Sequence, residues 1–148
     1  RNQWEGILPD LEPFAPDRNS SAARLPPLKG CKILVVEDEH LIAQDLEVML
    51  EDAGANVVGP VDSLPKAIRL AGDTERIDVA LLNVFLNGDT VFPLVDQLQG
   101  RRVPILFLTG YDEANIPKQY SNIPRCEKPA RPGRVVEELT ALLRPLAA

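Results

Sequence analysis

The sequence is poor in the side chains that build metal centres, disulfides and nucleophilic active sites. Its 148 residues include a single histidine, His40, and two cysteines, Cys31 and Cys126. A zinc site of histidine and cysteine ligands cannot be built from this set, and no Gly-x-Ser-x-Gly nucleophile elbow is present. We therefore expect a domain that is not an enzyme and whose two thiols are reduced, without a disulfide between them.

Long hydrophobic runs and an excess of positive charge are also missing. Apolar runs are only a few residues long, too short to span a bilayer, so we expect no membrane partner. The net charge of −6 argues against binding to a nucleic-acid backbone. The chain starts at Arg1 with neither a methionine nor a signal-peptide hydrophobic region. We therefore expect a cytoplasmic location, and a chain that is a piece of a longer protein.

The first thirty residues differ in composition from the rest. They hold five of the fourteen prolines and equal numbers of acidic and basic side chains, so the net negative charge resides in residues 31–148. This composition predicts a proline-rich linker or N-terminal extension over residues 1–30, followed by one domain over residues 31–148. The extension also carries large apolar side chains, which leave open whether it is a spacer or docks on a neighbouring surface. They are Trp4, Ile7, Leu8, Leu11 and Phe14.

From residue 32 onwards, short apolar runs alternate with helical patterns. The runs predict strands at residues 32–36, 56–58, 79–82, 104–108 and 125–127, the second closed by Gly59-Pro60. Helices are expected between them, the second capped by Ser63 and the third by Thr90, with a last helix over residues 132–143. The stretch 110–124 contains two prolines and little helical periodicity, so the fourth helix is expected to be short or irregular.

This alternation predicts an α/β fold with right-handed crossovers. Strands that are apolar at every residue indicate a parallel sheet covered on both faces. We therefore expect a doubly wound, flavodoxin-like, five-stranded parallel sheet of order 2-1-3-4-5.

Polar side chains stand where four of these strands end. They are Glu37 and Asp38 after the first strand, Asn83 after the third, Thr109 after the fourth and Lys128 after the fifth. In the predicted order these groups meet at the carboxyl edge of the sheet, where doubly wound folds bind ligands. Adjacent carboxylates suit Mg²⁺, and a hydroxyl and an ammonium group suit phosphoryl oxygens.

Four segments, at residues 33–39, 78–83, 104–110 and 127–129, resemble in order the signatures of response-regulator receiver domains. The resemblance implies a two-component phosphorelay module that binds Mg²⁺ and accepts a phosphoryl group from a histidine kinase onto an aspartate. It assigns Glu37, Asp38 and the backbone carbonyl of Phe85 to the metal. It assigns Thr109 to a switch hydroxyl and Lys128 to an invariant lysine.

The segment Phe-Leu-Thr-Gly-Tyr, residues 107–111, is similar to a receiver subgroup with a Phe-x-Thr-Gly-Tyr motif. The chain therefore resembles either the C-terminal receiver of a bacterial hybrid histidine kinase or a single-domain receiver. Arg125 stands where the family often has a rotating aromatic residue. A guanidinium is always charged, so we expect Arg125 at the surface, with Tyr111 supplying the aromatic contact near Thr109.

The acceptor position departs from the family, because it holds Asn83. A carboxamide has no anionic oxygen and cannot form an acyl phosphate, so the chain is expected not to be phosphorylated as written. With two carboxylates instead of three, Mg²⁺ should bind only weakly, with Asn83 as a further ligand. Such a receiver would act by binding a histidine kinase or an output protein. The sequence leaves open whether Asn83 is natural or an engineered inactivation, and whether the domain is a dimer.

The competing hypothesis is a flavodoxin-like domain that binds a small ligand or cofactor at the same edge. A bound phosphate would need a loop rich in Gly, Ser or Thr after the first strand. The sequence has Glu37-Asp38-Glu39 there, and these anions would repel it. The loop therefore favours the signalling module.

Overall fold

The computed structural model describes residues 26–110 and 116–143, so the expectations for Tyr111 and for the apolar side chains of residues 4–14 lie outside it. In chain order the elements are β1 (Lys32–Val36), α2 (His40–Asp52), β2 (Asn56–Val61), α3 (Leu64–Asp73), β3 (Val79–Asn83), β4 (Phe85–Leu86), β5 (Asp89–Thr90), α4 (Phe92–Gly100), β6 (Ile105–Thr109), the 3-10 helix η2 (Lys118–Tyr120), β7 (Arg125–Glu127) and α5 (Pro132–Leu143).

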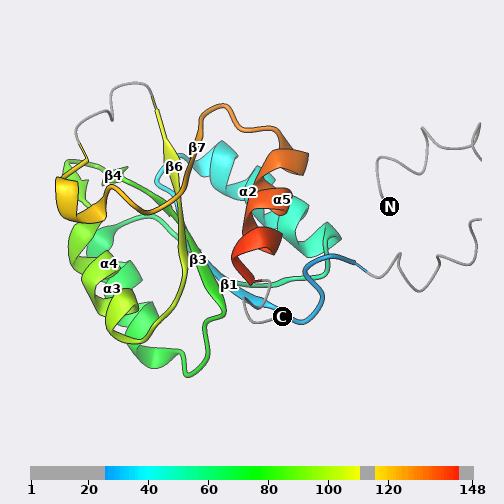
Figure 1. Cartoon of the computed structure of the whole chain (residues 1–148), viewed down its shortest axis with the longest axis horizontal. Helices are drawn as coiled ribbons and strands as arrows, with labels where there is room; N and C mark the ends of the chain where they lie inside the picture. Colours follow the sequence, from blue (N-terminus) through cyan, green and yellow to red (C-terminus); the bar gives the residue numbers. More distant parts are fainter. Residues whose placement is uncertain (1–25, 111–115, 144–148) are drawn as a thin grey trace, which may run out of the picture.

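Five of the strands form one parallel sheet in the order β2-β1-β3-β6-β7. Helices α2 and α5 cover one face of the sheet and α3 and α4 cover the other (Figure 1). This confirms the predicted doubly wound order. The chain adds strands towards one edge up to β2 and towards the other edge from β3 onwards, so the switch point lies between β1 and β3. No helix in the described ranges is long and apolar enough to cross a bilayer.

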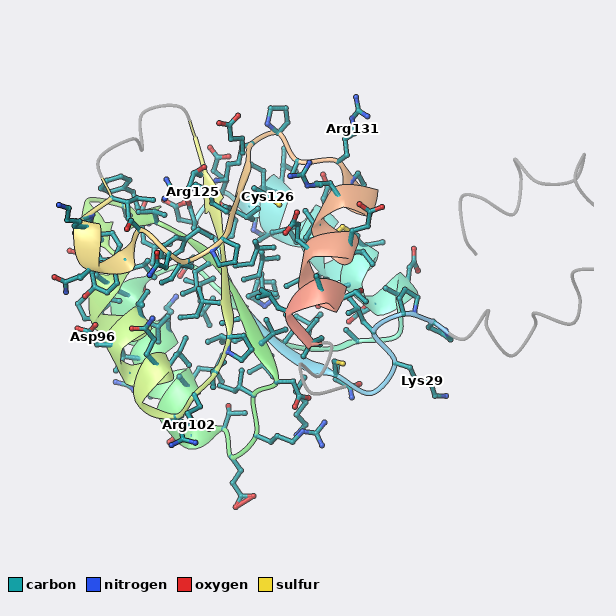
Figure 2. The ribbon with its side chains drawn as sticks, in the orientation of Figure 1. Lys29, Asp96, Arg102, Arg125, Cys126 and Arg131 are labelled. Atoms are coloured by element: carbon teal, nitrogen blue, oxygen red, sulfur yellow. The ribbon has the colours of Figure 1, made fainter. Side chains whose placement is uncertain are left out.

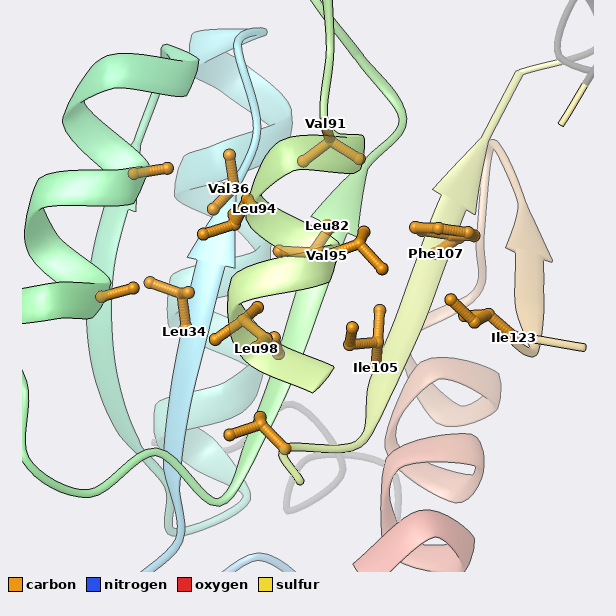
Figure 3. Close-up of a cluster of buried hydrophobic side chains, with 14 of the residues drawn as sticks. Leu34, Val36, Leu82, Val91, Leu94, Val95, Leu98, Ile105, Phe107 and Ile123 are labelled. Atoms are coloured by element: carbon orange, nitrogen blue, oxygen red, sulfur yellow. The ribbon is translucent and has the colours of Figure 1, made fainter. Parts of the chain in front are cut away.

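Each face of the sheet has its own hydrophobic core. Leu34, Leu82 and Phe107 point towards α3 and α4, where Figure 3 shows the packed cluster. Their chain neighbours, such as Ile33 and Leu81, belong to the core under α2 and α5. Successive side chains of a strand point to opposite faces, so a strand between two cores must be apolar throughout. This accounts for the uninterrupted apolar runs in the sequence.

Two local expectations were wrong. Strand β2 does not close at Gly59-Pro60 but continues to Val61, through a cis peptide bond before Pro60. Thr90 does not cap the third helix: it pairs with Phe85 in the small β4-β5 hairpin, and α4 begins after Val91. The Ser63 cap is confirmed, since its hydroxyl accepts a hydrogen bond from the backbone N–H of Lys66.

Residues 26–30 pack against the end of α2. Leu28 is fully buried in the core, and its backbone N–H donates to the carbonyl of Ala53 at 2.8 Å. Gly30 N–H donates in the same way to the carbonyl of Gly54 at 3.1 Å. The chain therefore enters the domain several residues before β1.

The helix expected to be short or irregular before β7 is a single 3-10 turn in the described residues. The described part of this segment, residues 116–124, contains η2 and no α-helix. Tyr120 anchors it: the ring stacks on Phe92 with centroids 4.5 Å apart, and the hydroxyl donates to Asp96 Oδ1 at 2.8 Å. Arg125 on β7 is exposed, as its charge predicts, whereas Cys126 lies between the sheet and α5 (Figure 2).

Candidate functional site

The carboxyl edge of the sheet holds the buried polar side chains of the domain. In the described residues these are Glu37, Asn83 and Thr109, each less than 5% exposed. Glu37 directly follows β1, and the other two are the last residues of β3 and β6, which are neighbouring strands. Burying polar groups is costly unless they have partners, so their meeting at one edge marks this as the candidate site.

The side chain of Asn83 lies between the two carboxylates that follow β1. Its Nδ2 donates to Glu37 Oε2 at 3.3 Å and to Asp38 Oδ1 at 3.0 Å. With a carboxylate on each side, the amide must present its NH₂ group here, because its oxygen would be repelled. Asn83 Oδ1 is therefore turned from these carboxylates, buried and without a hydrogen-bond partner among the described residues. Asn83, at the family's phosphoryl-acceptor position, therefore stabilises the two carboxylates by donating hydrogen bonds to them.

Glu37 is the most tightly held of these groups. Its Oε1 forms an ion pair with Lys128 Nζ at 2.9 Å, and its Oε2 also accepts the backbone N–H of Glu39 at 2.9 Å. Burial nevertheless raises the pKa of the Glu37 carboxyl above its ordinary value, because desolvation outweighs the Glu39 N–H and the Lys128 charge that lower it. Lys128 is placed for this contact at the end of β7, where its N–H donates to the Thr109 carbonyl at 2.7 Å.

Asp38 is held by the loop that follows β3. Its Oδ2 accepts the backbone N–H of Asn87 at 3.0 Å. Asn87 and Gly88 form the turn of the β4-β5 hairpin and both have positive φ, 47° and 93°. An Asn-Gly pair is the preferred sequence for such a turn, so this contact had a signal in the sequence that our reasoning missed.

The structure brings Glu37, Asp38, Asn83 and Lys128 into direct contact and places Thr109 at the same edge. Phe85 follows Asn83 closely in β4, and its side chain is 40% exposed. His40 is exposed in the first turn of α2. Cys31 and Cys126 are both free, as expected.

Mg²⁺ prefers several oxygen ligands in octahedral geometry, and the oxygens at this edge meet that preference only in part. Each oxygen of Glu37 and Asp38 already faces a protein donor. Asn83 offers the pair its NH₂ group, so its oxygen would become a ligand only after the amide rotates. In the described ranges no three His, Cys, Asp or Glu side chains form a metal-binding group. A cation at these residues would compete with the Asn83 amide for the oxygens of Glu37 and Asp38.

Comparison with known proteins gives consistent relatives. The chain is 37% identical over 84 residues to the phyllosphere-induced regulator PhyR of Methylorubrum extorquens, a match covering 55% of this chain and 32% of that protein. It is 27% identical over 86 residues to the transcriptional regulatory protein PdtaR of Mycobacterium tuberculosis, covering 57% and 42%. The match therefore spans less than half of the length of these curated relatives.

Solved structures agree with this. The solution structure of SdrG from Sphingomonas melonis Fr1 has a TM-score of 0.69 and 35% identity, over 78% of this chain and 98% of that one. The family model of the response regulator receiver domain matches residues 33–123, which include Glu37, Asp38, Asn83 and Thr109. This match supports the signalling module over a flavodoxin-like cofactor binder. The chain belongs to the response regulator receiver domain family.

Proposed function

We propose that this receiver domain is a cytoplasmic two-component signalling module that is not phosphorylated as written, catalyses no reaction, and acts by binding a histidine kinase or an output protein. The observation that carries the proposal is the position of the Asn83 amide between Glu37 and Asp38. A carboxylate nucleophile at this point would be repelled by both neighbours and would need a cation. The neutral amide needs none, and it has no anionic oxygen with which to form an acyl phosphate.

Weak Mg²⁺ binding is the second part of the proposal. We assign the metal to Glu37, Asp38, the Phe85 backbone carbonyl and Asn83, with Thr109 and Lys128 next to it. Bound there, Mg²⁺ would neutralise the acidic pair. A cation must displace the N–H contacts of the Asn83 amide, and it finds two carboxylates where a receiver with an acceptor aspartate offers three. Relative to such a receiver, the binding free energy of Mg²⁺ should be weaker by about 1–3 kcal/mol, with a dissociation constant in the millimolar range.

Incubation with acetyl phosphate and Mg²⁺, followed by intact mass spectrometry, tests the first part. The chain should gain no alkali-labile phosphoryl group, whereas Asn83→Asp should gain one. Asn87→Asp makes the same chemical change in the neighbouring turn and should gain none. Labelling of the unaltered chain would overturn the proposal.

An NMR titration of the Glu37 and Asp38 amide signals with Mg²⁺ tests the second part. Micromolar affinity would contradict it. Binding to a candidate histidine kinase is then measured with unphosphorylated chain, and no phosphoryl donor should be required.

A further inference from the structure

A groove of about 700 Å³ lies between α2 and α5 and reaches down to Leu108 of β6. Its lining is mainly apolar: Ile42, Val48 and Met49 come from α2, Val136 from α5, and Ala130 from the segment before α5. We call this the α2-α5 groove. The candidate site described above does not use these apolar side chains.

The α2-α5 groove leaves apolar surface uncovered. Val48 is 56% exposed on α2, and Ile42, Met49 and Val136 are only partly buried. A single exposed valine is ordinary, but a contiguous concave group of apolar side chains is typical of a binding surface. Asp45 and Asp52 stand among the lining residues and add negative charge.

The chain itself enters the fold at this groove. Pro26 and Pro27, the first described residues, are lining residues of the groove, and the next residue, Leu28, is buried in the core beneath α2. Figure 1 shows this first stretch, in blue, beside α2 and α5. The described chain therefore begins at the groove, so a segment that precedes Pro26 in the sequence is tethered there.

The sequence supplies such a segment. Trp4, Ile7, Leu8, Leu11 and Phe14 place five large apolar side chains within eleven residues, although the surrounding composition is that of a linker. In a chain of random-coil dimensions, about 12 residues correspond to a root-mean-square span of roughly 20 Å. The 13-residue helix α2 is also about 20 Å long, so the segment can reach any part of the groove.

We propose that the segment over residues 4–14 docks intramolecularly in the α2-α5 groove. Tethering at this distance gives an effective concentration in the millimolar range, so an intrinsic dissociation constant of about 0.1 mM would keep about nine molecules in ten docked. The inference goes beyond the proposed signalling function and does not depend on it.

Docking places the segment beside the acidic edge of the sheet. Lys128 lines the groove as well as pairing with Glu37 Oε1 at 2.9 Å. The docked segment would cover Val48 and Met49 and exclude other partners from this part of α2. The extension is thereby a component of the domain's binding surface.

The composition offers two unique probes. Trp4 is the single tryptophan and Met49 the single methionine, one in the segment and the other in the groove. In the full chain we expect Trp4 fluorescence to be blue-shifted and protected from acrylamide. The methyl signal of Met49 should carry a ring-current shift that disappears in Trp4→Leu.

Val48→Glu places a charge in the groove at an already exposed position and should lower docking about tenfold or more. Trp4 emission should then move to that of free tryptophan. Ile68→Glu is the matched control: Ile68 is an exposed aliphatic residue of α3, on the opposite layer, and its variant should leave Trp4 protected. Circular dichroism confirms folding, and Val136→Glu replaces Val48→Glu if that variant unfolds.

Three outcomes would overturn the proposal. The first is a Trp4 exposed to acrylamide in the unaltered chain, and the second is protection that survives both groove variants. The third is protection that appears only at high concentration together with a dimer, because the occupant would then be the segment of a second copy.

Discussion

The substitution Asn83→Asp tests how the buried edge is stabilised. In the structure the amide NH₂ of Asn83 bridges Glu37 and Asp38, at 3.3 Å and 3.0 Å. The variant replaces this donor with a third carboxylate of the same size in the same place. Two hydrogen bonds to charged groups are lost, and two repulsive contacts take their place.

The size of the effect has an upper limit. At 3.0 Å and an effective dielectric constant of 20, two unit charges repel by about 5 kcal/mol. The site can avoid part of this cost by binding a proton, and holding a carboxyl with an ordinary pKa near 4 protonated at pH 7 costs about 4 kcal/mol. We therefore expect Asn83→Asp to lose about 2–4 kcal/mol of unfolding free energy at pH 7 without divalent cations, a fall in Tm of roughly 10 °C.

Mg²⁺ should restore the lost unfolding free energy of Asn83→Asp and should have little effect on the unaltered chain. A cation present at one hundred times its dissociation constant stabilises the folded state by about 2.7 kcal/mol, whereas at its weak site in the unaltered chain the effect should be small. Thermal melts with and without Mg²⁺ measure both effects, and Asn87→Asp, at an exposed turn position, controls for the added charge. Equal stability of Asn83→Asp and the unaltered chain without Mg²⁺ would refute the argument.

Three further outcomes are expected. A ¹³C NMR titration should show the pKa of the Glu37 carboxyl raised above its ordinary value of 4.5. The stability that this group contributes should be full below pH 4.5 and should decline as the pH rises through its folded pKa. Tyr120→Phe should lose about 1 kcal/mol in urea unfolding, because the hydroxyl bond to Asp96 is removed while the ring is kept, and adding Asp96→Asn should cost little more. Arg101→Ala should lose about 2 kcal/mol by the same assay, since this guanidinium donates to three backbone carbonyls at and after the end of α3.

The order of the sheet and the ends of the strands that carry the candidate site were predictable from the sequence, for a physical reason. A parallel sheet buried on both faces requires strands that are apolar at every residue, and such runs stand out between helical patterns. β7 and α5 were predicted to the residue. The boundaries failed where tertiary contacts override local signals. The turn-like Gly59-Pro60 pair lies inside a strand, because β2 resumes its pairing with β1 at Val61 after a register shift. Glycine is needed there, since Gly59 has a φ of 100° and a Cβ would lie 2.9 Å from the Val35 carbonyl oxygen.

The site was predictable as a set of residues, but its contacts were not. Strand ends identify which side chains reach the edge, as they did for Asn83 and Lys128. The direction of the Asn83 amide depends on the register that sets Val36 beside Leu82, and a sequence does not give that register. The burial of Leu28 was missed for a similar reason, because its partners on α2 are distant in sequence.

Lys128→Met separates the two forces acting on Glu37. The methionine has a similar length and no charge, so Glu37 Oε1, which is buried, loses its ion-pair partner. Removing one member of a buried pair leaves an uncompensated charge, and the expected loss at pH 7 is about 2–4 kcal/mol. The loss should shrink as the pH falls towards 5, because the Glu37 pKa, already raised by burial, rises further without Lys128 and the carboxyl takes up a proton.

The matched control for this prediction is Lys66→Met. Lys66 pairs with Asp62 at 3.1 Å, but both side chains are more than half exposed, and exposed pairs contribute little. Urea unfolding of both variants at pH 5 and pH 7 should therefore show a large, pH-dependent loss for Lys128→Met and a small, constant one for Lys66→Met. A loss for Lys128→Met that stays the same at both pH values would mean that the lysine acts through packing, and the electrostatic account of the buried edge would be wrong.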